Sequence, residues 1–310
     1  MRDCVISAGV GRPRAINLCD SDVLPLSLSD FTGIEDTTAR LFLVYSSICQ
    51  LLGDIVECCL RRQLQSGQQN VLENALYRWV KQDFRKTVDS NNPQHYSFET
   101  RQILVTYFAN LIILDRSPTP DGIPSARSFM ASSFISGIYK EFLDRDELCR
   151  LGPVFAFYAL CAGLALIPAT RFYTLRDTAN EEINYLKESL KVLTKQWGSA
   201  FGCLRALHRL TEDTRLQHMF RDEPIPILRE EMVPFFEDFN PRLCRQWSMF
   251  FNAPDIPASV SQAGNGAGPV PDDSDYLTSS ADPMDLLMGG DWEGIGFDWS
   301  GSWLLDNNPI

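Results

Sequence analysis

Large apolar side chains recur at steps of three and four across residues 37–252, the spacing of one face of an α-helix. No segment rich in Val and Ile alternates with a period of two between hairpin turns, as strands would. The sequence therefore predicts an all-α fold, packed as an irregular multi-helix array. The expected helices cover 37–62, 71–88, 97–114, 126–143, 153–167, 178–210 and 242–251, and the sixth allows a break near Trp197 and Gly198.

The two ends of the chain lack this helical period. Gly11, Pro13 and Pro25 interrupt residues 1–36, which we expect to form an extended lead-in to the helical domain at 37–252. Residues 253–275 are rich in Pro, Gly, Ala, Ser and Asp, a composition typical of a flexible linker. Residues 276–310 mix acids with large apolar groups, and we call them the acidic–aromatic tail.

The net charge of −12 is concentrated at the C-terminal end. Residues 253–310 hold ten acids and no Lys or Arg, whereas residues 1–252 hold 28 basic and 30 acidic side chains. Affinity for DNA depends on neutralising backbone phosphates, so a nearly neutral body without a basic cluster predicts no direct DNA contact.

The cysteines and the longest apolar run exclude two further classes. No pair among the nine cysteines has C-x2-C spacing, so no structural zinc site and no other metal site is expected. The run at 154–168 has about fifteen residues, whereas a membrane span needs about 20. We therefore predict a buried helix there and no membrane association.

Catalytic patterns are missing from the sequence. It holds only three His, and no G-x-S-x-G, H-E-x-x-H or G-x4-G-K-[ST] motif. Its one aspartate-rich run, at 272–275, lies in the predicted linker rather than on a helix. We therefore predict no catalytic residue, no cofactor and no enzyme. A helical metal-dependent enzyme remains the distant alternative.

The acidic–aromatic tail carries the one positive functional signal in the composition. Acids interleaved with Trp, Phe and Leu are typical of disordered activation segments, in which mutual repulsion keeps the aromatics available for a coactivator groove. The alternative is that these side chains dock on the chain's own helices. The predicted coactivator-binding residues are Leu286, Leu287, Trp292, Phe297, Trp299 and Trp303.

Four segments resemble the fungal-specific transcription factor regulatory domain, the middle homology region of zinc binuclear cluster factors, with cutinase-type activators as the nearest branch. Residues 11–31 resemble its Gly-Arg-Pro segment with a closing Asp-Phe, and residues 103–118 resemble its helix ending in Leu-His-Arg-Pro. An Ala-Gly pair and a Leu-x6-Trp-x2-Ala pattern also match. The matching positions are Gly11, Arg12, Pro13, Asp30, Phe31, Tyr107, Asp115, Arg116, Ala162, Gly163 and Trp197.

This resemblance covers residues 11–252. Within its second segment, Asp115 stands where the family usually has His, and Ser117 separates Arg116 from the following Pro. Two larger departures are that the six-cysteine zinc cluster and the family's usual helical segment before Gly-Arg-Pro are both absent from this chain. The resemblance implies a nuclear transcription regulator that responds to a small-molecule effector or a partner and pairs as a homodimer or with a zinc-cluster factor. The alternative is a scaffold or inhibitory partner of a full-length zinc-cluster factor. For Gly11, Arg12 and Pro13 we favour a turn that positions the lead-in against the helices, rather than a direct role in ligand binding.

Overall fold

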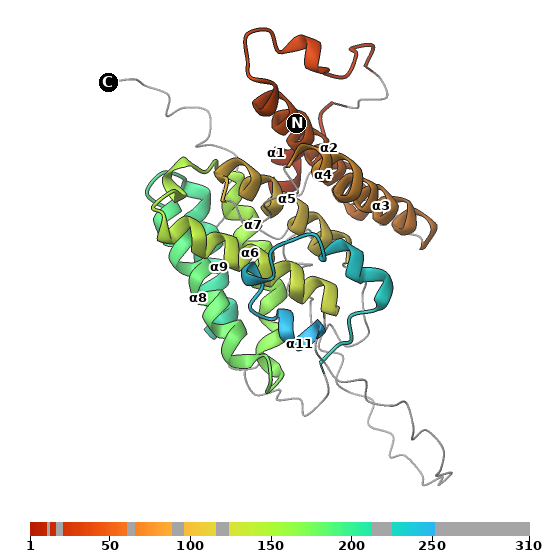
Figure 1. Ribbon diagram of the computed structural model, residues 1–310. Helices are drawn as coiled ribbons and strands as arrows, with labels where there is room; N and C mark the ends of the chain where they lie inside the picture. Colours follow the sequence, from red (N-terminus) through yellow and green to blue (C-terminus); the bar gives the residue numbers. More distant parts are fainter. Residues whose placement is uncertain are drawn as a thin grey trace.

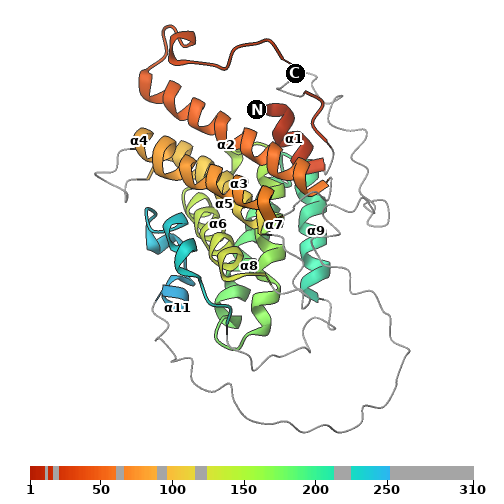
Figure 2. The ribbon, with the colours of Figure 1, turned by 90° about the vertical axis from the view of Figure 1, so that its right-hand side faces the viewer.

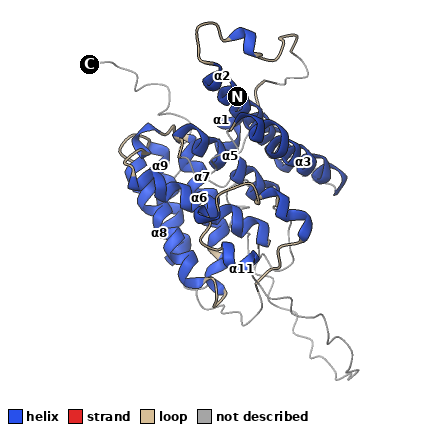
Figure 3. Ribbon diagram, in the orientation of Figure 1, coloured by secondary structure: helices blue, strands red, loops and turns tan. Residues whose placement is uncertain are grey.

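The computed structural model describes residues 1–10, 13–16, 21–60, 66–88, 96–115, 124–212 and 225–251. These residues form helices and loops without a strand, which confirms the predicted all-α multi-helix array (Figure 3). The α-helices are α1 (Arg2–Val10), α2 (Asp36–Leu60), α3 (Ser66–Arg78), α4 (Arg85–Thr87), α5 (Phe98–Leu114), α6 (Ala126–Asp144), α7 (Val154–Leu166), α8 (Arg176–Leu193), α9 (Gly198–Glu212) and α11 (Trp247–Phe251). Short 3-10 helices lie at Leu28–Asp30, Leu148–Arg150, Pro168–Arg171, Glu230–Phe235 and Pro241–Leu243, and a π-helix at Trp79–Phe84 joins α3 to α4.

Helices α5, α6 and α7 form the centre of the array. Helix α5 packs against α2, α6 and α7, while α8 packs against α6 and α7, and α9 packs against α7 and α8 (Figures 1 and 2). Residues 225–251 run along one side of α6, as the blue segment in Figure 1 shows. This arrangement encloses one continuous core, in which α5 and α7 are buried along nearly their whole length.

Local sequence signals explain where several helices begin and end. Ser97 caps α5 by accepting a hydrogen bond from the Thr100 amide at 3.2 Å, and Ser125 caps α6 in the same way. The predicted helix at 178–210 is two helices, because the chain turns at Trp197 and α9 starts at Gly198. The predicted helix at 71–88 begins earlier, at Ser66, and its second half includes the π-helical turn.

The expected extended lead-in at residues 1–36 is wrong for Arg2–Val10, which form α1. Cys4, Ser7 and Ala8 lie on its buried face and pack on α2. The two helices approach closely because Gly53 of α2 has no side chain: a Cβ there would lie 3.0 Å from the Cys4 sulfur. Small residues at steps of three and four were the signal for this helix, which a search for large apolar groups overlooks.

The predicted helix at 242–251 is shorter than expected. Only Trp247–Phe251 is α-helical, and it follows a 3-10 turn at Pro241–Leu243 that Asn240 caps. The turn brings the Leu243 carbonyl against α6 at Gly137, where a Cβ would lie 2.0 Å from the carbonyl oxygen. A regular helix from residue 242 would continue past this contact, so tertiary packing overrides the helical period here.

Two helical stretches, Asp36–Cys59 and Val154–Arg171, are apolar and long enough to cross a membrane by length and composition alone. The second is 83% buried inside the fold, which confirms the predicted buried helix at 154–168. The first is 39% buried. Part of α2 therefore presents apolar side chains at the surface, among them Phe42 at 38% exposure.

Candidate functional site

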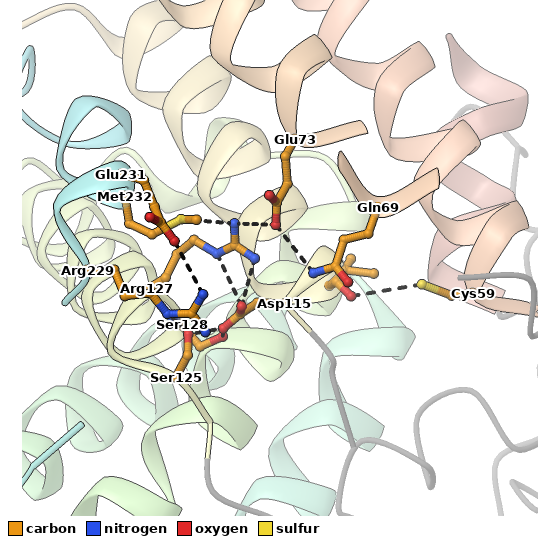
Figure 4. Close-up of polar contacts among 11 residues, drawn as sticks. Cys59, Gln69, Glu73, Asp115, Ser125, Arg127, Ser128, Arg229, Glu231 and Met232 are labelled. Atoms are coloured by element: carbon orange, nitrogen blue, oxygen red, sulfur yellow. Dashed lines mark hydrogen bonds and ion pairs between the residues drawn. The ribbon is translucent and has the colours of Figure 1, made fainter. Parts of the chain in front are cut away.

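A buried charged network lies where α5 ends and α6 begins (Figure 4). Arg127 of α6 is 3% exposed, and its Nη2 lies 2.7 Å from an Asp115 carboxylate oxygen while its Nε lies 3.2 Å from the same oxygen. Its Nη1 lies 2.8 Å from a carboxylate oxygen of Glu73 on α3. One guanidinium therefore joins three helices through two carboxylates.

Serine side chains and a sulfur complete this network. Ser125 and Ser128 both donate hydrogen bonds to the second Asp115 oxygen, and the Ser128 distance is 2.8 Å. Arg127 Nη1 also lies 3.3 Å from the sulfur of Met232. Met232 belongs to residues 225–251 beside α6, which we call the C-terminal segment. Asp115, the position where the resembling family usually has His, is thus the acceptor at the centre of the network.

Ion pairs and hydrogen bonds hold the charged groups of this network in place. Burial lowers the pKa of Arg127, but the carboxylates of Asp115 and Glu73 outweigh burial and raise this pKa above its usual value. Both carboxylates are used by hydrogen-bond donors, so neither is placed as a general base. Over the part of the chain that the structure describes, no group of three His, Cys, Asp or Glu residues could hold a metal ion.

Tyr107, another position of the resemblance, is fully buried in the aromatic core. Its ring stacks on Trp79 with a centroid distance of 5.3 Å. Its hydroxyl donates a hydrogen bond to the Phe235 carbonyl at 3.0 Å, and burial raises its pKa well above the usual value. Tyr107 therefore holds the C-terminal segment to α5.

The Ala-Gly pair and Trp197 occupy two separate helix contacts. A Cβ on Gly163 would lie 2.7 Å from a Leu207 methyl carbon, so this glycine lets α7 and α9 approach closely, next to the buried Ala162. Trp197 is half-buried, and its Nε1 donates to the Leu151 carbonyl at 2.9 Å. Trp197 thus ties the turn between α8 and α9 to the start of α7.

The positions near the N-terminus make local contacts. Asp30 accepts a hydrogen bond from the Ser27 amide at 2.7 Å, and Phe31 meets the Phe42 ring edge-on at a centroid distance of 5.6 Å. Pro13 is exposed, and Arg14, directly after it, is anchored to α2 by ion pairs of 2.9 and 2.7 Å to two carboxylates. Gly11, Arg12 and Arg116 lie outside the described residues.

The described positions of the resemblance therefore do not converge on one site, since each has its own partners on a different helix contact. All six predicted coactivator-binding residues, Leu286, Leu287, Trp292, Phe297, Trp299 and Trp303, lie outside the described residues, as do the predicted linker at 253–275 and the whole tail at 276–310.

A second polar cluster, which was not predicted from the sequence, is centred on the fully buried Glu182 of α8. Ser133 of α6 and Gln246 of the C-terminal segment both donate hydrogen bonds to its carboxylate. Burial raises the pKa of Glu182 to about 7. The available signal was an acid among the apolar positions of one helix face, between Ala179 and Ile183.

The known proteins to which this chain is similar are fungal transcription regulators. The chain is 27% identical to Cutinase transcription factor 1 alpha of Fusarium vanettenii, over 93% of its own length and 37% of that protein. It is 26% identical to the Acetamidase regulatory protein of Aspergillus fumigatus, over 74% of its length and 32% of that protein. It is 27% identical to the protein of that name in Emericella nidulans, over 69% and 29%. No family model and no solved structure matches the chain.

These similarities define a class. The chain is a distant homologue, at about 26% identity, of fungal transcription regulators over most of its length, and these homologues are not enzymes. It spans about a third of the length of these relatives.

Proposed function

We propose that this chain is the regulatory part of a fungal transcription regulator of the zinc-cluster family, a helical body joined to an acidic activation tail and acting in the nucleus. The observation that carries the proposal is the similarity to a fungal transcription factor over 93% of the chain. The near neutrality of residues 1–252 supports action without direct DNA contact.

In this proposal the tail recruits a transcriptional coactivator. Ten acids and no basic residue follow residue 252, and half of the chain's six Trp lie among them. Large aromatic and aliphatic side chains anchor such segments in apolar grooves, while the acids keep the segment soluble. Leu286, Leu287, Trp292, Phe297, Trp299 and Trp303 are the proposed anchors.

The helical body would respond to an effector or a partner and control the tail. Helix α11 ends at Phe251, directly before the predicted linker at 253–275 that leads to the tail. Residues 225–251 are tied to the core by Tyr107, by Met232 beside Arg127, and by Gln246 at Glu182. A change in that packing would therefore act on the part of the body nearest the tail.

The tail proposal is tested with the whole chain fused to a heterologous DNA-binding domain on a reporter. Replacing the six proposed anchors with Ala should reduce activation by on the order of ten-fold or more, because hydrophobic anchors supply most of the binding free energy in such interfaces. Replacing Ser259, Ser261, Ser274, Ser279 and Ser280 with Ala is the matched control and should leave activation unchanged. Equal expression of the fusions is checked by immunoblot, and undiminished activation by the anchor variant would refute the tail's role.

A scaffold or inhibitory partner of a full-length zinc-cluster factor is the second candidate. It is favoured by exposed apolar side chains in residues 21–34, the stretch that precedes α2. Val23 is 77% exposed and Leu24 is 85% exposed, and apolar patches of this kind mark interaction sites. Co-purification with a zinc-cluster factor that survives deletion of residues 252–310 would favour this candidate over an activator.

A further inference from the structure

We propose that Glu182, Ser133 and Gln246 form a proton-dependent latch that holds residues 240–251 against α6 and α8. The latch concerns the described part of the chain and stands independently of what the tail binds. Any effect of the latch on the tail would rest on the function proposed above.

The geometry joins three segments at one buried carboxylate. Gln246 Nε2 donates to Glu182 Oε2 at 2.6 Å, and Ser133 Oγ donates to Glu182 Oε1. The Gln246 amide nitrogen donates in turn to Ser133 Oγ at 3.3 Å. Glu182, Ser133 and Gln246 are all 0% exposed, so these bonds form away from water. Loss of them would release the middle of residues 240–251.

Backbone and apolar contacts also hold this segment against α6. The Leu243 carbonyl rests on Gly137 of α6, and the Cys244 thiol lies 4.0 Å from the Met130 carbonyl on the same helix. Trp247 packs edge-on against Phe134 at a centroid distance of 6.0 Å. These contacts are neutral, which leaves Glu182 as the buried ionisable carboxyl between this segment and the two helices.

The charged groups around Glu182 are engaged elsewhere. On the C-terminal segment, Arg245 pairs with Glu181 of α8 at 2.6 Å and meets the Tyr185 hydroxyl at 3.0 Å. On α6, Lys140 pairs with Asp144 at 2.7 Å. Burial raises the pKa of the Cys244 thiol to about 12, so the thiol stays neutral. Among the described groups, none supplies a cation in contact with the Glu182 carboxylate.

A buried carboxylate without a paired cation favours its protonated form. Burial raises the pKa of Glu182 to about 7, although the hydrogen bonds from Ser133 and Gln246 act in the opposite direction. The ionised carboxylate can only accept hydrogen bonds, whereas the protonated form also offers a donor. Within the described structure Gln246 Oε1 is buried without a partner, and a flip of this amide would place an acceptor beside that donor.

The direction of the pH response follows from proton linkage. The pKa of Glu182 is about 7 when residues 240–251 are docked, and a solvated Glu has a pKa of about 4.3. The docked state therefore binds the proton more tightly, and docking is favoured at low pH. This advantage diminishes as pH rises through about 7, and the docking equilibrium should fall about ten-fold between about pH 6 and about pH 8.

The test is hydrogen exchange of the full chain at about pH 6 and about pH 8, corrected for intrinsic exchange rates. We expect protection of residues 240–251 to fall about ten-fold at the higher pH in the wild type. Glu182→Gln, which cannot titrate, should show equal protection at both values. Its matched control is Glu188→Gln, at an exposed position of the same helix, which should retain the wild-type response. The latch would be overturned if protection of residues 240–251 in the wild type were the same at both pH values. It would also be overturned if Glu182→Gln kept the wild-type pH response.

A second variant covers the case in which Glu182→Gln does not fold. Ser133→Ala removes a donor to the carboxylate, so the midpoint of the pH response should move to higher pH while the response itself remains. An unmoved midpoint in Ser133→Ala would also overturn the latch. The tail variant with six Ala should keep the wild-type response, which separates failure of the latch from failure of the tail's proposed function.

Discussion

Arg127→Met should lower the free energy of unfolding by about 3–5 kcal/mol, because it removes a buried guanidinium that pairs with two carboxylates. Asp115 and Glu73 have side-chain exposures of 11% and 17%, so water would replace Arg127 only in part. Denaturant unfolding of the wild type and the variant measures the difference. The size of the effect reflects unpaired charge more than the net stability of the ion pairs.

Two comparisons separate this explanation from loss of packing. Lys140→Met breaks an exposed pair on the same helix and should cost less than about 1 kcal/mol. Adding Asp115→Asn and Glu73→Gln to Arg127→Met should restore much of the lost stability, because the uncompensated charges are then gone. If the triple variant were less stable than Arg127→Met alone, buried charge would not be the cause.

Gly137→Ala should cost about 1–3 kcal/mol, the range for overpacking a filled core, and its damage should be confined to one part of the chain. The new Cβ would lie 2.0 Å from the Leu243 carbonyl oxygen, which is backbone and cannot turn away as a side chain does. Relief requires residues 240–251 to shift from α6. We therefore expect hydrogen exchange to increase in that segment while α5 and α7 keep their protection.

Gly163→Ala is the matched control for this substitution. Its Cβ would meet the end of the Leu207 side chain at 2.7 Å, and that side chain can adopt another rotamer. We expect a smaller loss of stability and no change in residues 240–251. Equal exchange of this segment in both variants would show that Gly137 does not position it.

Helix existence was predictable here, because most helices bury one large apolar stripe and some carry clear caps. Ser97 marks the start of α5, and Gly198 marks the break between α8 and α9. Helix α1 was missed since it packs through small residues such as Cys4 and Ala8, which a search for large apolar groups does not register. Residues 242–251 were predicted to form one helix, but only Trp247–Phe251 is α-helical. The path of this stretch depends on its contact with Gly137, which lies far earlier in the chain.

The polar clusters were less predictable than the helices. The resemblance marked Asp115, but nothing in the local sequence indicates that Arg127 and Glu73 converge on one network, since these pairings depend on how α3, α5 and α6 pack. The same holds for Glu182 and Gln246, which are 64 residues apart. Periodicity places residues on helix faces, whereas the partners of a buried charge are set by tertiary structure.

Reporter transcription driven by the whole chain, with and without a fused heterologous DNA-binding domain, tests the proposed function most directly. We expect activation when the chain is tethered and none when it is free, because residues 1–252 are nearly neutral and the tail is acidic. Activation by the tethered chain should depend on residues 252–310. A tethered chain that does not raise transcription, in cells where a known activation domain does, would contradict the proposal that this protein is an activator.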